Sequence, residues 1–522
     1  MNPTMSLKLE YYPEPKLTFG FDQKTADPRD GLILFGPHEP LAPFKVKAGV
    51  IATDEGLTAY KEFVERINKP IFSTKTIYGK LKNDEVGRPS FPGFEAVFNV
   101  KWTPIPEIYK PLLQNIIDGN LQEKNKKRRT QALVDLYLEK IVRATNDDDA
   151  QVNIWFIVIP RSLYFKCKPG SAGKDLSSGT KKFIVSSQRG QTAFQFPGEE
   201  NYVEELQKLV DTSSDFHHLL KARLIQEKIR IPVQIILDST LHFRDKYRNL
   251  PFDENMKAHL AWTQATTMYY KFGNLPWKLA DIRDGVCYLG LVFKKTNQVL
   301  NSSTVCSAAQ MFLKDGDGSV FRGNIGLWQG KNEKEFHLDE PSSYDLLAMA
   351  LDDYNEKWKK YPEELFIHGR ARFSDEEWNG FQRAVIERKA PTHLVGIVIK
   401  DTGGFKLFRD AVGEKCNYGV MRGMTLKVND KEAYLITRGF VPRLNTQPSL
   451  EVPNPLHIQI TRGDADIDTV LKDILALTKL NYNACLYGDG LPVTLRFSDV
   501  IGSILTATDN WKTEQRKFMY YI

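Results

Sequence analysis

A chain of 522 residues, 42% hydrophobic and 26% charged, has the composition of a globular protein with a sizeable core, and its length allows roughly two to four domains. The net charge of +6 is mildly basic, which is compatible with a groove for a polyanion but is shared by many proteins that bind no nucleic acid. Five scattered cysteines without C-x-x-C spacing argue against a zinc module or a disulfide framework, and the lack of a signal-peptide core or a long apolar run argues against a membrane partner and favours a cytoplasmic location.

The N-terminal part mixes strand and helix signals. Residues 1–37 contain LKLEYY and LTFGF, which predict two short strands, followed by a Pro/Gly turn in TADPRDGLILFGP. FKVKAGVIAT at 44–53 and FPGFEAVFNVKW at 91–102 predict strands. EGLTAYKEFVERINKP at 55–70 has apolar residues at helical spacing and predicts an amphipathic helix that Pro70 ends.

A basic run follows at 123–144, and an acidic turn is expected at 146–149. Such a run usually forms a solvated helix face, although a contact with phosphate or with a partner stays open. The basic residues are Lys124, Lys126, Lys127, Arg128 and Arg129.

The run VNIWFIVIP at 152–160 is continuously apolar and predicts a central parallel strand that is covered on both faces. ARLIQEKIRIPVQII at 222–236 supplies a helix and the next strand, which is the order of a Rossmann-like sheet. The segment 166–182 contains GSAGK without the spacing of a nucleotide-binding P-loop, so a flexible loop is expected, with a nucleic-acid contact as the alternative.

Four polar residues in this region could hold a phosphate and an unstacked base. His217 and Lys221 are four apart and share one face of the predicted helix. Gln234 follows in the strand IPVQII, and Lys271 ends a second helix just before Gly273. Each residue alone could be an ordinary surface donor, but one His, two Lys and one Gln are the donors that such a ligand needs.

From Val286 onwards a second α/β unit is predicted. A DGDG turn between two apolar runs within 302–323 predicts a hairpin. An EF-hand is the alternative, but its ligand spacing and its bidentate Glu are missing. Helices are predicted at 343–361 and in the helix–loop–helix segment 468–505, and Ser374 with Glu377 predicts a capped helix after the strand ELFIHG. Further strands are predicted at 286–295, 393–400, 433–440 and 455–460. This strand-rich start followed by alternating elements is a ribonuclease-H-like order.

The order His-x3-Lys, Ile-Pro-x-Gln and Tyr-Lys-x-Gly-x-x-Pro-Trp resembles the guide 5′-end pocket of Argonaute MID domains. YLGLVF, IHGRARF and LTKLNYNAC followed by LPVTLRFSDVIG resemble Argonaute PIWI motifs. The resemblance implies an α/β protein with a Rossmann-like MID domain and an RNase-H-like PIWI domain, without a PAZ or N domain. It places N-terminal strands that pack on the PIWI domain at 1–37, the MID domain at 38–270 and the PIWI domain at 271–522.

The same resemblance assigns roles in the pocket. His217 is expected to stack on or bond the first guide nucleotide, and Lys221, Gln234 and Lys271 to bind its 5′ phosphate. In related PIWI proteins the chain end turns back into this pocket, so the carboxylate of Ile522, with Gln234, is expected to hold a Mg²⁺ ion against the phosphate. An ordinary buried last strand would explain the apolar end KFMYYI equally well.

Slicing needs a cluster of carboxylates that holds two divalent ions about 4 Å apart. Val292 and Arg370 occupy the first two carboxylate positions of the PIWI motifs, and only Asp499 remains at the late helical position. A catalytically inactive PIWI domain is therefore expected, in which Asp499 is a structural or surface residue and Arg370 contacts nucleic-acid phosphate or forms a salt bridge. The alternative is an active nuclease with a relocated carboxylate set.

The sequence most resembles the Argonaute subunit of short systems that are paired with a TIR–APAZ protein. The family context implies a sensor that binds a guide RNA, pairs it with single-stranded target DNA and activates the NAD(P)ase of its partner through higher-order assembly, causing abortive infection in defence against plasmids or phage. A sirtuin-type or nuclease-type effector on the partner is the alternative, and a purely structural scaffold is a further one. Nothing in the residues selects RNA over DNA.

Overall fold

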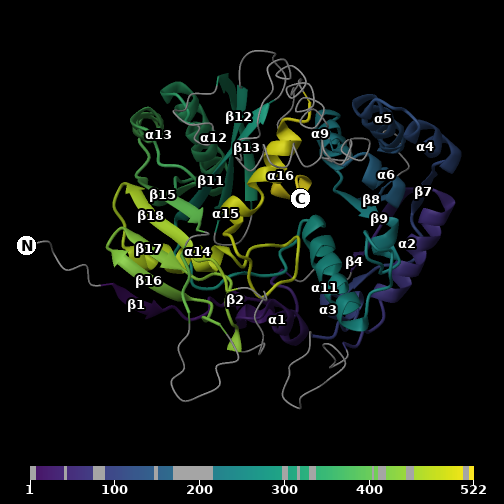
Figure 1. Ribbon diagram of the computed structural model, residues 1–522, viewed down its shortest axis with the longest axis horizontal. Coiled ribbons are helices and arrows are strands. Elements are labelled where there is room, and N and C mark those ends of the chain that lie inside the picture. Colours follow the sequence, from purple (N-terminus) through teal and green to yellow (C-terminus); the bar gives the residue numbers. More distant parts are fainter. Residues whose placement is uncertain are drawn as a thin grey trace, which may run out of the picture.

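The computed structural model describes residues 7–39, 44–73, 89–145, 151–168, 215–296, 304–313, 318–327, 337–402, 405–408, 419–442, 452–508 and 517–522. Two sheets dominate this part of the chain, and they lie on opposite sides of the molecule (Figure 1). The acidic turn expected at 146–149, most of the loop at 166–182 and most of the DGDG turn lie outside the described residues.

The first sheet is parallel and has the order β7-β5-β8-β9. Its strands are β5 (Ala48–Ala52), β7 (Ile108–Pro111), β8 (Ile154–Ile159) and β9 (Val233–Leu237). All residues of β8 are buried, because alternate side chains enter two different cores. Phe156 packs in the core that contains α2 (Asp54–Ile67), and Trp155 packs in the core that contains α5 (Lys126–Thr145). This confirms the predicted strand with two covered faces.

Short helices and one long helix complete this parallel-sheet lobe. They are α4 (Gln114–Leu121), α6 (Arg161–Lys166), α9 (Phe216–Gln226), α10 (Asp238–Leu241) and α11 (Glu254–Lys271). The side chains of Asp215 and Asp253 accept main-chain N–H groups at the starts of α9 and α11, as N-cap residues do. Gly273 follows α11 with a φ of +85°, which ends the helix directly after Lys271.

Two predictions in the N-terminal part are wrong. TADPRDGLILFGP is not a turn: it contains helix α1 (Pro28–Phe35), because Asp27 accepts the N–H of Arg29 and Pro28 occupies the first helical turn. The predicted strand at 91–102 contains helix α3 (Phe94–Phe98) and only a short strand, β6 (Val100–Lys101), paired with β4 (Phe44–Lys45). Positive φ angles at Gly93 and Asn99 bound α3, and its Phe94 ring packs on Trp102.

The second sheet has nine strands in the order β1-β16-β17-β18-β15-β14-β11-β12-β13. The adjacent strands β11, β14 and β15 are parallel, and β12 and β13 form the antiparallel hairpin that the DGDG turn predicts. The strand bounds are β1 (Lys8–Tyr11), β11 (Val286–Thr296), β12 (Thr304–Leu313), β13 (Gly318–Leu327), β14 (Glu364–Gly369), β15 (His393–Asp401), β16 (Met424–Asn429), β17 (Glu432–Leu435) and β18 (Leu456–Arg462).

Helices cover both faces of this nine-stranded sheet. Leu289 of β11 packs in a core with α12 (Glu340–Trp358) and α13 (Asp375–Glu387), whereas the adjacent Tyr288 packs in a core with α14 (Ile467–Leu477) and α16 (Ser498–Leu505). A short helix, α15 (Val493–Arg496), precedes α16. The Ser374–Glu377 capping box at the start of α13 is confirmed.

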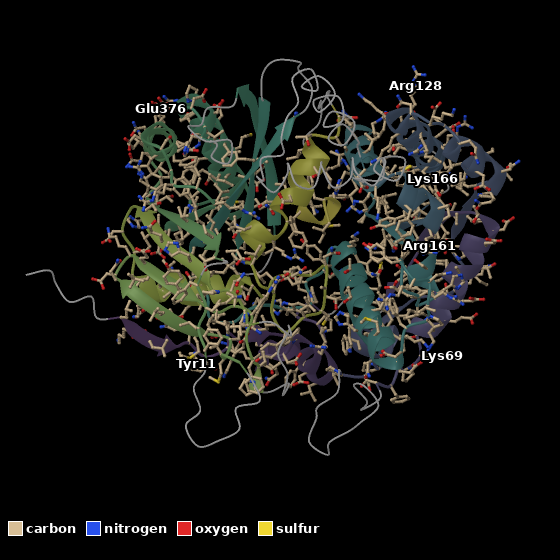
Figure 2. The ribbon with its side chains drawn as sticks, viewed as in Figure 1. Tyr11, Lys69, Arg128, Arg161, Lys166 and Glu376 are labelled. Carbon is tan, nitrogen blue, oxygen red and sulfur yellow. The ribbon has the colours of Figure 1, made fainter. Side chains whose placement is uncertain are left out.

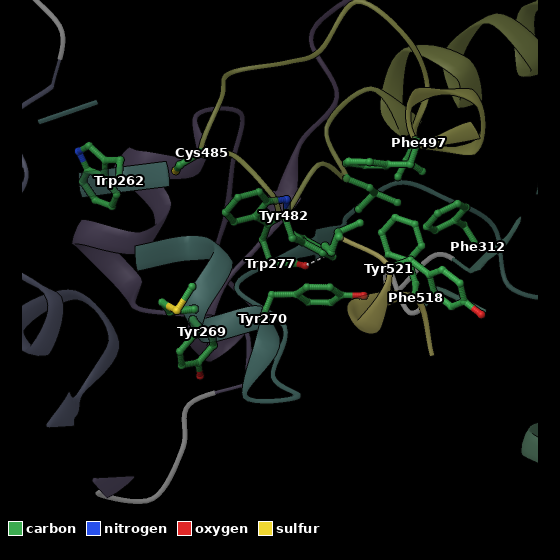
Figure 3. Close-up of a cluster of buried hydrophobic side chains, with 14 of the residues drawn as sticks. Trp262, Tyr269, Tyr270, Trp277, Phe312, Tyr482, Cys485, Phe497, Phe518 and Tyr521 are labelled. Atoms are coloured by element: carbon green, nitrogen blue, oxygen red, sulfur yellow. Dashed lines mark hydrogen bonds between the residues drawn. The ribbon is translucent and has the colours of Figure 1, made fainter. Parts of the chain in front are cut away.

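The nine-stranded sheet with its helices is called the second lobe below. Segments that are far apart in the sequence pair with one another: β1 pairs with β16 within this sheet, and β2 (Leu17–Thr18) pairs with β10 (Lys278–Leu279) and with β3 (Lys24–Thr25) in a small sheet of its own. An aromatic core lies between α11 and the C-terminal segments (Figure 3), where the Tyr482 hydroxyl donates to the Trp277 carbonyl at 2.7 Å. None of the described helices is long and apolar enough to span a membrane.

Candidate functional site

The four polar residues singled out in the sequence come from three elements that meet beside the chain end. His217 and Lys221 lie on α9, Gln234 lies on β9, and Lys271 is the last residue of α11. Lys221 is 3% exposed and Lys271 is 2% exposed, so both amines are inside the protein. These four residues are called the cationic pocket below.

Hydrogen bonds connect the cationic pocket to main-chain oxygens. Lys271 Nζ donates to the carbonyl of Val233 at 3.0 Å and to Oε1 of Gln234 at 2.7 Å. Lys221 Nζ donates to the main-chain oxygen of Ile522. The carbonyl of Val233 was not foreseen from the sequence, because a main-chain group leaves no signal in residue types.

Burial and mutual repulsion weaken the positive charges of the pocket. Burial lowers the pKa of Lys271 to about 7. Burial, and then the charge of Lys271, lowers the pKa of Lys221 well below its usual value. Burial lowers the pKa of His217 as well, and both lysines add to that effect, so the three groups lie within electrostatic reach of one another.

The pocket lacks a countercharge among the described side chains. No Asp or Glu side chain in the described part of the chain forms an ion pair with Lys221 or Lys271, whose partners are the oxygens named above. The Asp215 carboxylate accepts the main-chain N–H of His217 at 2.7 Å as the cap of α9. The oxygen that accepts from Lys221 belongs to the chain end, whose carboxylate offsets one positive charge at most. Burying a second amine without a countercharge is costly, and an anion in the pocket would offset that cost.

The chain end lies beside Lys221 of the cationic pocket. Its last turn is the 3₁₀ helix η4 (Phe518–Tyr520), not a strand. Phe518 packs on Phe312 and Phe497, while Tyr521 and Ile522 are buried (Figure 3). The Tyr520 hydroxyl donates to the carbonyl of Arg230 at 2.6 Å, which fastens the end to the segment between α9 and β9.

The three carboxylate positions lie on or directly after two neighbouring strands of the nine-stranded sheet and on a helix that packs against one of them. Gly290 of β11 is paired with His368 of β14. Val292 and Arg370 follow this pair by two residues each, Val292 within β11 and Arg370 directly after β14, and Asp499 lies on α16, which packs against β11. Arg370 and Asp499 are exposed. Among the described residues, no group of three or more His, Cys, Asp or Glu side chains could hold a metal ion.

Near these positions lies a buried polar contact that the sequence did not reveal. His368 Nδ1 is 2.8 Å from the Thr494 hydroxyl, and burial lowers the pKa of His368 to about 3, so the imidazole is neutral. Gln310 Nε2 lies 3.2 Å from the Ser498 hydroxyl. These contacts hold the start of α16 and the preceding α15 against the strands.

Part of the basic run has a structural role. Lys126 Nζ donates to the carbonyl of Lys168 at 2.6 Å, and Arg129 donates to the carbonyl of Lys166 at 2.8 Å, so both side chains cap the end of α6. Lys124, Lys127 and Arg128 are exposed, as a solvated helix face requires.

Comparisons with known proteins place the fold. No family model matches the sequence, and no curated protein matches it. Clostridium butyricum Argonaute bound to a guide DNA with 5′ deoxycytidine and a 19-mer target DNA aligns with 96% of this chain at 17% identity and a TM-score of 0.60. Aquifex aeolicus Argonaute aligns with 98% of the chain at 14% identity and a TM-score of 0.53. Its structure with externally bound siRNA aligns with 99% of the chain at 13% identity and a TM-score of 0.55.

This likeness shows an Argonaute-like fold over nearly the whole chain. The chain spans about half the length of the solved Argonautes, since it covers 53% of the first and 55% and 56% of the other two. That extent is consistent with a MID and a PIWI part without PAZ or N domains.

Proposed function

We propose that this Argonaute-like chain binds a guide strand by its 5′ phosphate and pairs it with a complementary target. The observation that carries the proposal is the cationic pocket, in which Lys221 and Lys271 are buried together without a carboxylate side chain as partner. A terminal phosphate carries about two negative charges and several acceptor oxygens, so it matches two buried amines and a neighbouring imidazole.

In this proposal each residue has a separate task. Lys221, Gln234 and Lys271 bind the phosphate oxygens, Gln234 also bonds Lys271 at 2.7 Å, and His217 stacks on or bonds the first nucleotide. The carboxylate of Ile522, with Gln234, would hold a Mg²⁺ ion against the phosphate. Carboxylate and amide oxygens are ligands that Mg²⁺ prefers, so the donor types fit such an ion. Both oxygens accept hydrogen bonds from Lys221 and Lys271, so the amines would have to turn to the phosphate when the ion binds.

The pocket predicts a pH-dependent preference for the phosphate. Free Lys271 has a pKa near 7, and a bound phosphate raises it, so binding takes up a proton when the pH is above about 7. The affinity ratio of 5′-phosphorylated to 5′-hydroxyl strands should therefore fall as the pH rises from 7 to 9, by up to about tenfold per pH unit for each proton taken up. Fluorescence anisotropy titrations with the phosphorylated and the hydroxyl strand measure this affinity ratio at each pH. A ratio that stays constant over this range would contradict the assignment.

We also propose that the chain does not cut its target. Val292 and Arg370 carry no carboxylate, and Asp499 alone cannot hold the metal pair that cleavage requires. Target recognition would then be the task of the second lobe, with base pairing supplying the sequence information and the protein reading the duplex by its shape and backbone.

Cleavage is expected neither from the wild-type chain nor from the Val292→Asp, Arg370→Asp double variant. The two new carboxylates lack the surrounding hydrogen bonds that orient metal ligands, so the double variant should produce no more cleaved strand than a reaction without protein. The assay incubates guide-loaded protein with a labelled complementary strand and Mg²⁺ or Mn²⁺, and separates products on a denaturing gel. Metal-dependent product from the wild-type chain would support the active-nuclease alternative, and product from the double variant alone would show that the site is only two residues from activity.

We further propose that the chain is the sensor of a short Argonaute system with guide RNA, single-stranded target DNA and a TIR–APAZ partner whose NAD(P)ase it activates, which depletes NAD and aborts infection. The Argonaute-like fold over nearly the whole chain supports the guide-binding part of this proposal. A partner with a sirtuin-type or nuclease-type effector is the alternative, and co-purification of the partner with the chain separates the two.

Sequencing of the nucleic acid that co-purifies with the chain tests the proposal directly. Short strands with a 5′ phosphate, and their ribose or deoxyribose chemistry, would identify the guide. A purified protein free of nucleic acid that also fails to discriminate a 5′ phosphate from a 5′ hydroxyl in vitro would favour a structural scaffold.

A further inference from the structure

Outside the cationic pocket, the parallel-sheet lobe carries a second cluster, here called the aromatic–cationic platform. It combines exposed or half-buried rings with cations that lie over them. Figure 2 shows Arg161 and Lys166 along α6 on this side of the molecule, and Tyr247 is 57% exposed. The members of the platform are Arg161, Tyr164, Phe165, Lys168, Lys246 and Tyr247.

Two lysines each lie over more than one ring of the platform. Lys168 Nζ is 4.7 Å from the ring centroid of Phe165 and 5.4 Å from that of Tyr247. Lys246 Nζ is 5.0 Å from the Tyr247 centroid and 5.2 Å from that of Tyr164. Rings and cations therefore alternate over one surface, as in grooves that bind single-stranded nucleic acid.

Main-chain hydrogen bonds fix the platform before any ligand arrives. Arg161 Nε donates to the carbonyl of Lys246 at 2.6 Å, which ties α6 to the loop after α10. In that loop the Asp245 carboxylate accepts the N–H groups of Tyr247 at 2.9 Å and Arg248 at 2.6 Å. Lys246 Nζ also donates to the Tyr164 hydroxyl at 3.1 Å. A rigid ring costs little entropy when it binds a ligand.

The cations of the platform have no carboxylate partner among the described residues. Lys168, Lys246 and the guanidinium of Arg161 form no ion pair there. The acidic groups beside them, Asp238 and Asp245, accept main-chain N–H groups, Asp238 from Arg161 at 3.1 Å. The surface therefore has surplus positive charge beside ring faces. A purely apolar protein partner would leave these charges without a counterion.

The platform adjoins the start of the helix that carries His217 but lies apart from the contacts of Lys271. The N–H of Phe216, at the start of α9, donates to the carbonyl of Cys167 at 3.2 Å, so the end of α6 adjoins the turn that carries His217. The amine of Lys271, however, binds the carbonyl of Val233 at the start of β9, whereas the N–H of Arg161 binds the carboxylate of Asp238, just past its end. Five residues of extended strand separate Val233 from Asp238, which is roughly 16 Å. This is several times the ~3.4 Å step of stacked nucleotides.

From this geometry we propose that the platform stacks an unpaired nucleotide other than the one whose phosphate occupies the cationic pocket. The inference rests on the proposed function for the origin of the strand. The nucleotide belongs either to the guide or to the target segment that continues past the guide's 5′ end. Tyr164 and Tyr247 supply ring faces, and Lys168 and Lys246 move from the rings to the flanking phosphates.

The test uses the full chain loaded with a 5′-phosphorylated guide and 2-aminopurine, whose fluorescence is quenched on stacking. One arm places the probe in the guide near its 5′ end, and the other places it in a single-stranded 3′ extension of the target. A target with a 5′ extension, which lies beyond the other end of the guide, is the control strand. The variants are Tyr247→Ala and Tyr164→Ala, with Tyr247→Phe as the conservative control and Trp358→Ala as an exposed aromatic control on the other lobe.

In one of the two arms, wild type and Tyr247→Phe should quench the probe, whereas each alanine variant should lose quenching and about tenfold in affinity. The Trp358→Ala variant and the 5′ extension should show no change. Unchanged quenching and affinity in both arms for correctly folded Tyr247→Ala and Tyr164→Ala would overturn the inference. If phosphorylated and hydroxyl guides bind equally while the alanine variants still lose quenching, the proposed function fails and the platform stands.

Discussion

Replacing both pocket lysines, by Lys221→Met and Lys271→Met, is expected to abolish the preference for a 5′-phosphorylated guide. Each charge-assisted hydrogen bond contributes about 1.5–3 kcal/mol, so the loss of two should weaken binding of the phosphorylated strand by about a hundredfold or more. Binding of the 5′-hydroxyl strand should change little, because it makes no contact that needs these charges. Methionine keeps the length of the side chain, so the variant leaves no large cavity.

Lys126→Met is the matched control for that experiment. Lys126 is half-buried and donates to a main-chain carbonyl, and burial lowers its pKa to about 8, but it lies outside the cationic pocket. The control should keep the full preference for the phosphate. Equal losses for both guide strands in the double variant would show that Lys221 and Lys271 do not read the phosphate.

Folding of the double variant is not expected to limit this test. The pKa of Lys271 is near 7 in the folded chain and near 10.5 in the unfolded chain, so the unfolded state binds the extra proton between these values. The ligand-free wild type should consequently gain stability as the pH rises from 7 to 10.5, and the double variant should lack this slope. Urea denaturation at several pH values checks both statements.

Gly290→Ala is expected to destabilise the second lobe severely. A Cβ atom at Gly290 would lie 1.9 Å from the main-chain oxygen of Thr494, and backbone cannot move aside as the end of a flexible side chain can. β11 and α15 would have to separate, which would also disturb the contact between Thr494 and His368. The expected cost is about 3 kcal/mol or more in free energy of unfolding, measured as a lower urea midpoint.

Gly119→Ala is the matched control in the other lobe. Gly119 lies within helix α4, and a Cβ there would meet no atom within 4 Å. Alanine at such a position should stabilise the protein by up to about 1 kcal/mol, because it restricts the unfolded chain and favours the helix. A Gly290→Ala variant as stable as Gly119→Ala would mean that α15 does not press on β11.

Local patterns in the sequence account for most of the secondary structure that positions the site. The continuous apolar run at 152–160 gave a buried parallel strand, and the spacing of His217 and Lys221 put both on α9. The segment 25–37 and Phe94–Phe98 were predicted wrongly because Asp27, Pro28 and Gly93 act through capping and backbone geometry, which apolar periodicity does not report.

Residue identity alone therefore determined that Val292 and Arg370 carry no carboxylate, and the order of polar residues determined which ones could face a phosphate. Tertiary structure alone decided that Lys221 and Lys271 are buried together, that the main-chain oxygen of Ile522 lies beside Lys221, and that α6 meets the loop after α10. The reason is that burial, and with it the pKa of an amine, depends on segments packed from hundreds of residues away, whereas periodicity reports only neighbours along the chain.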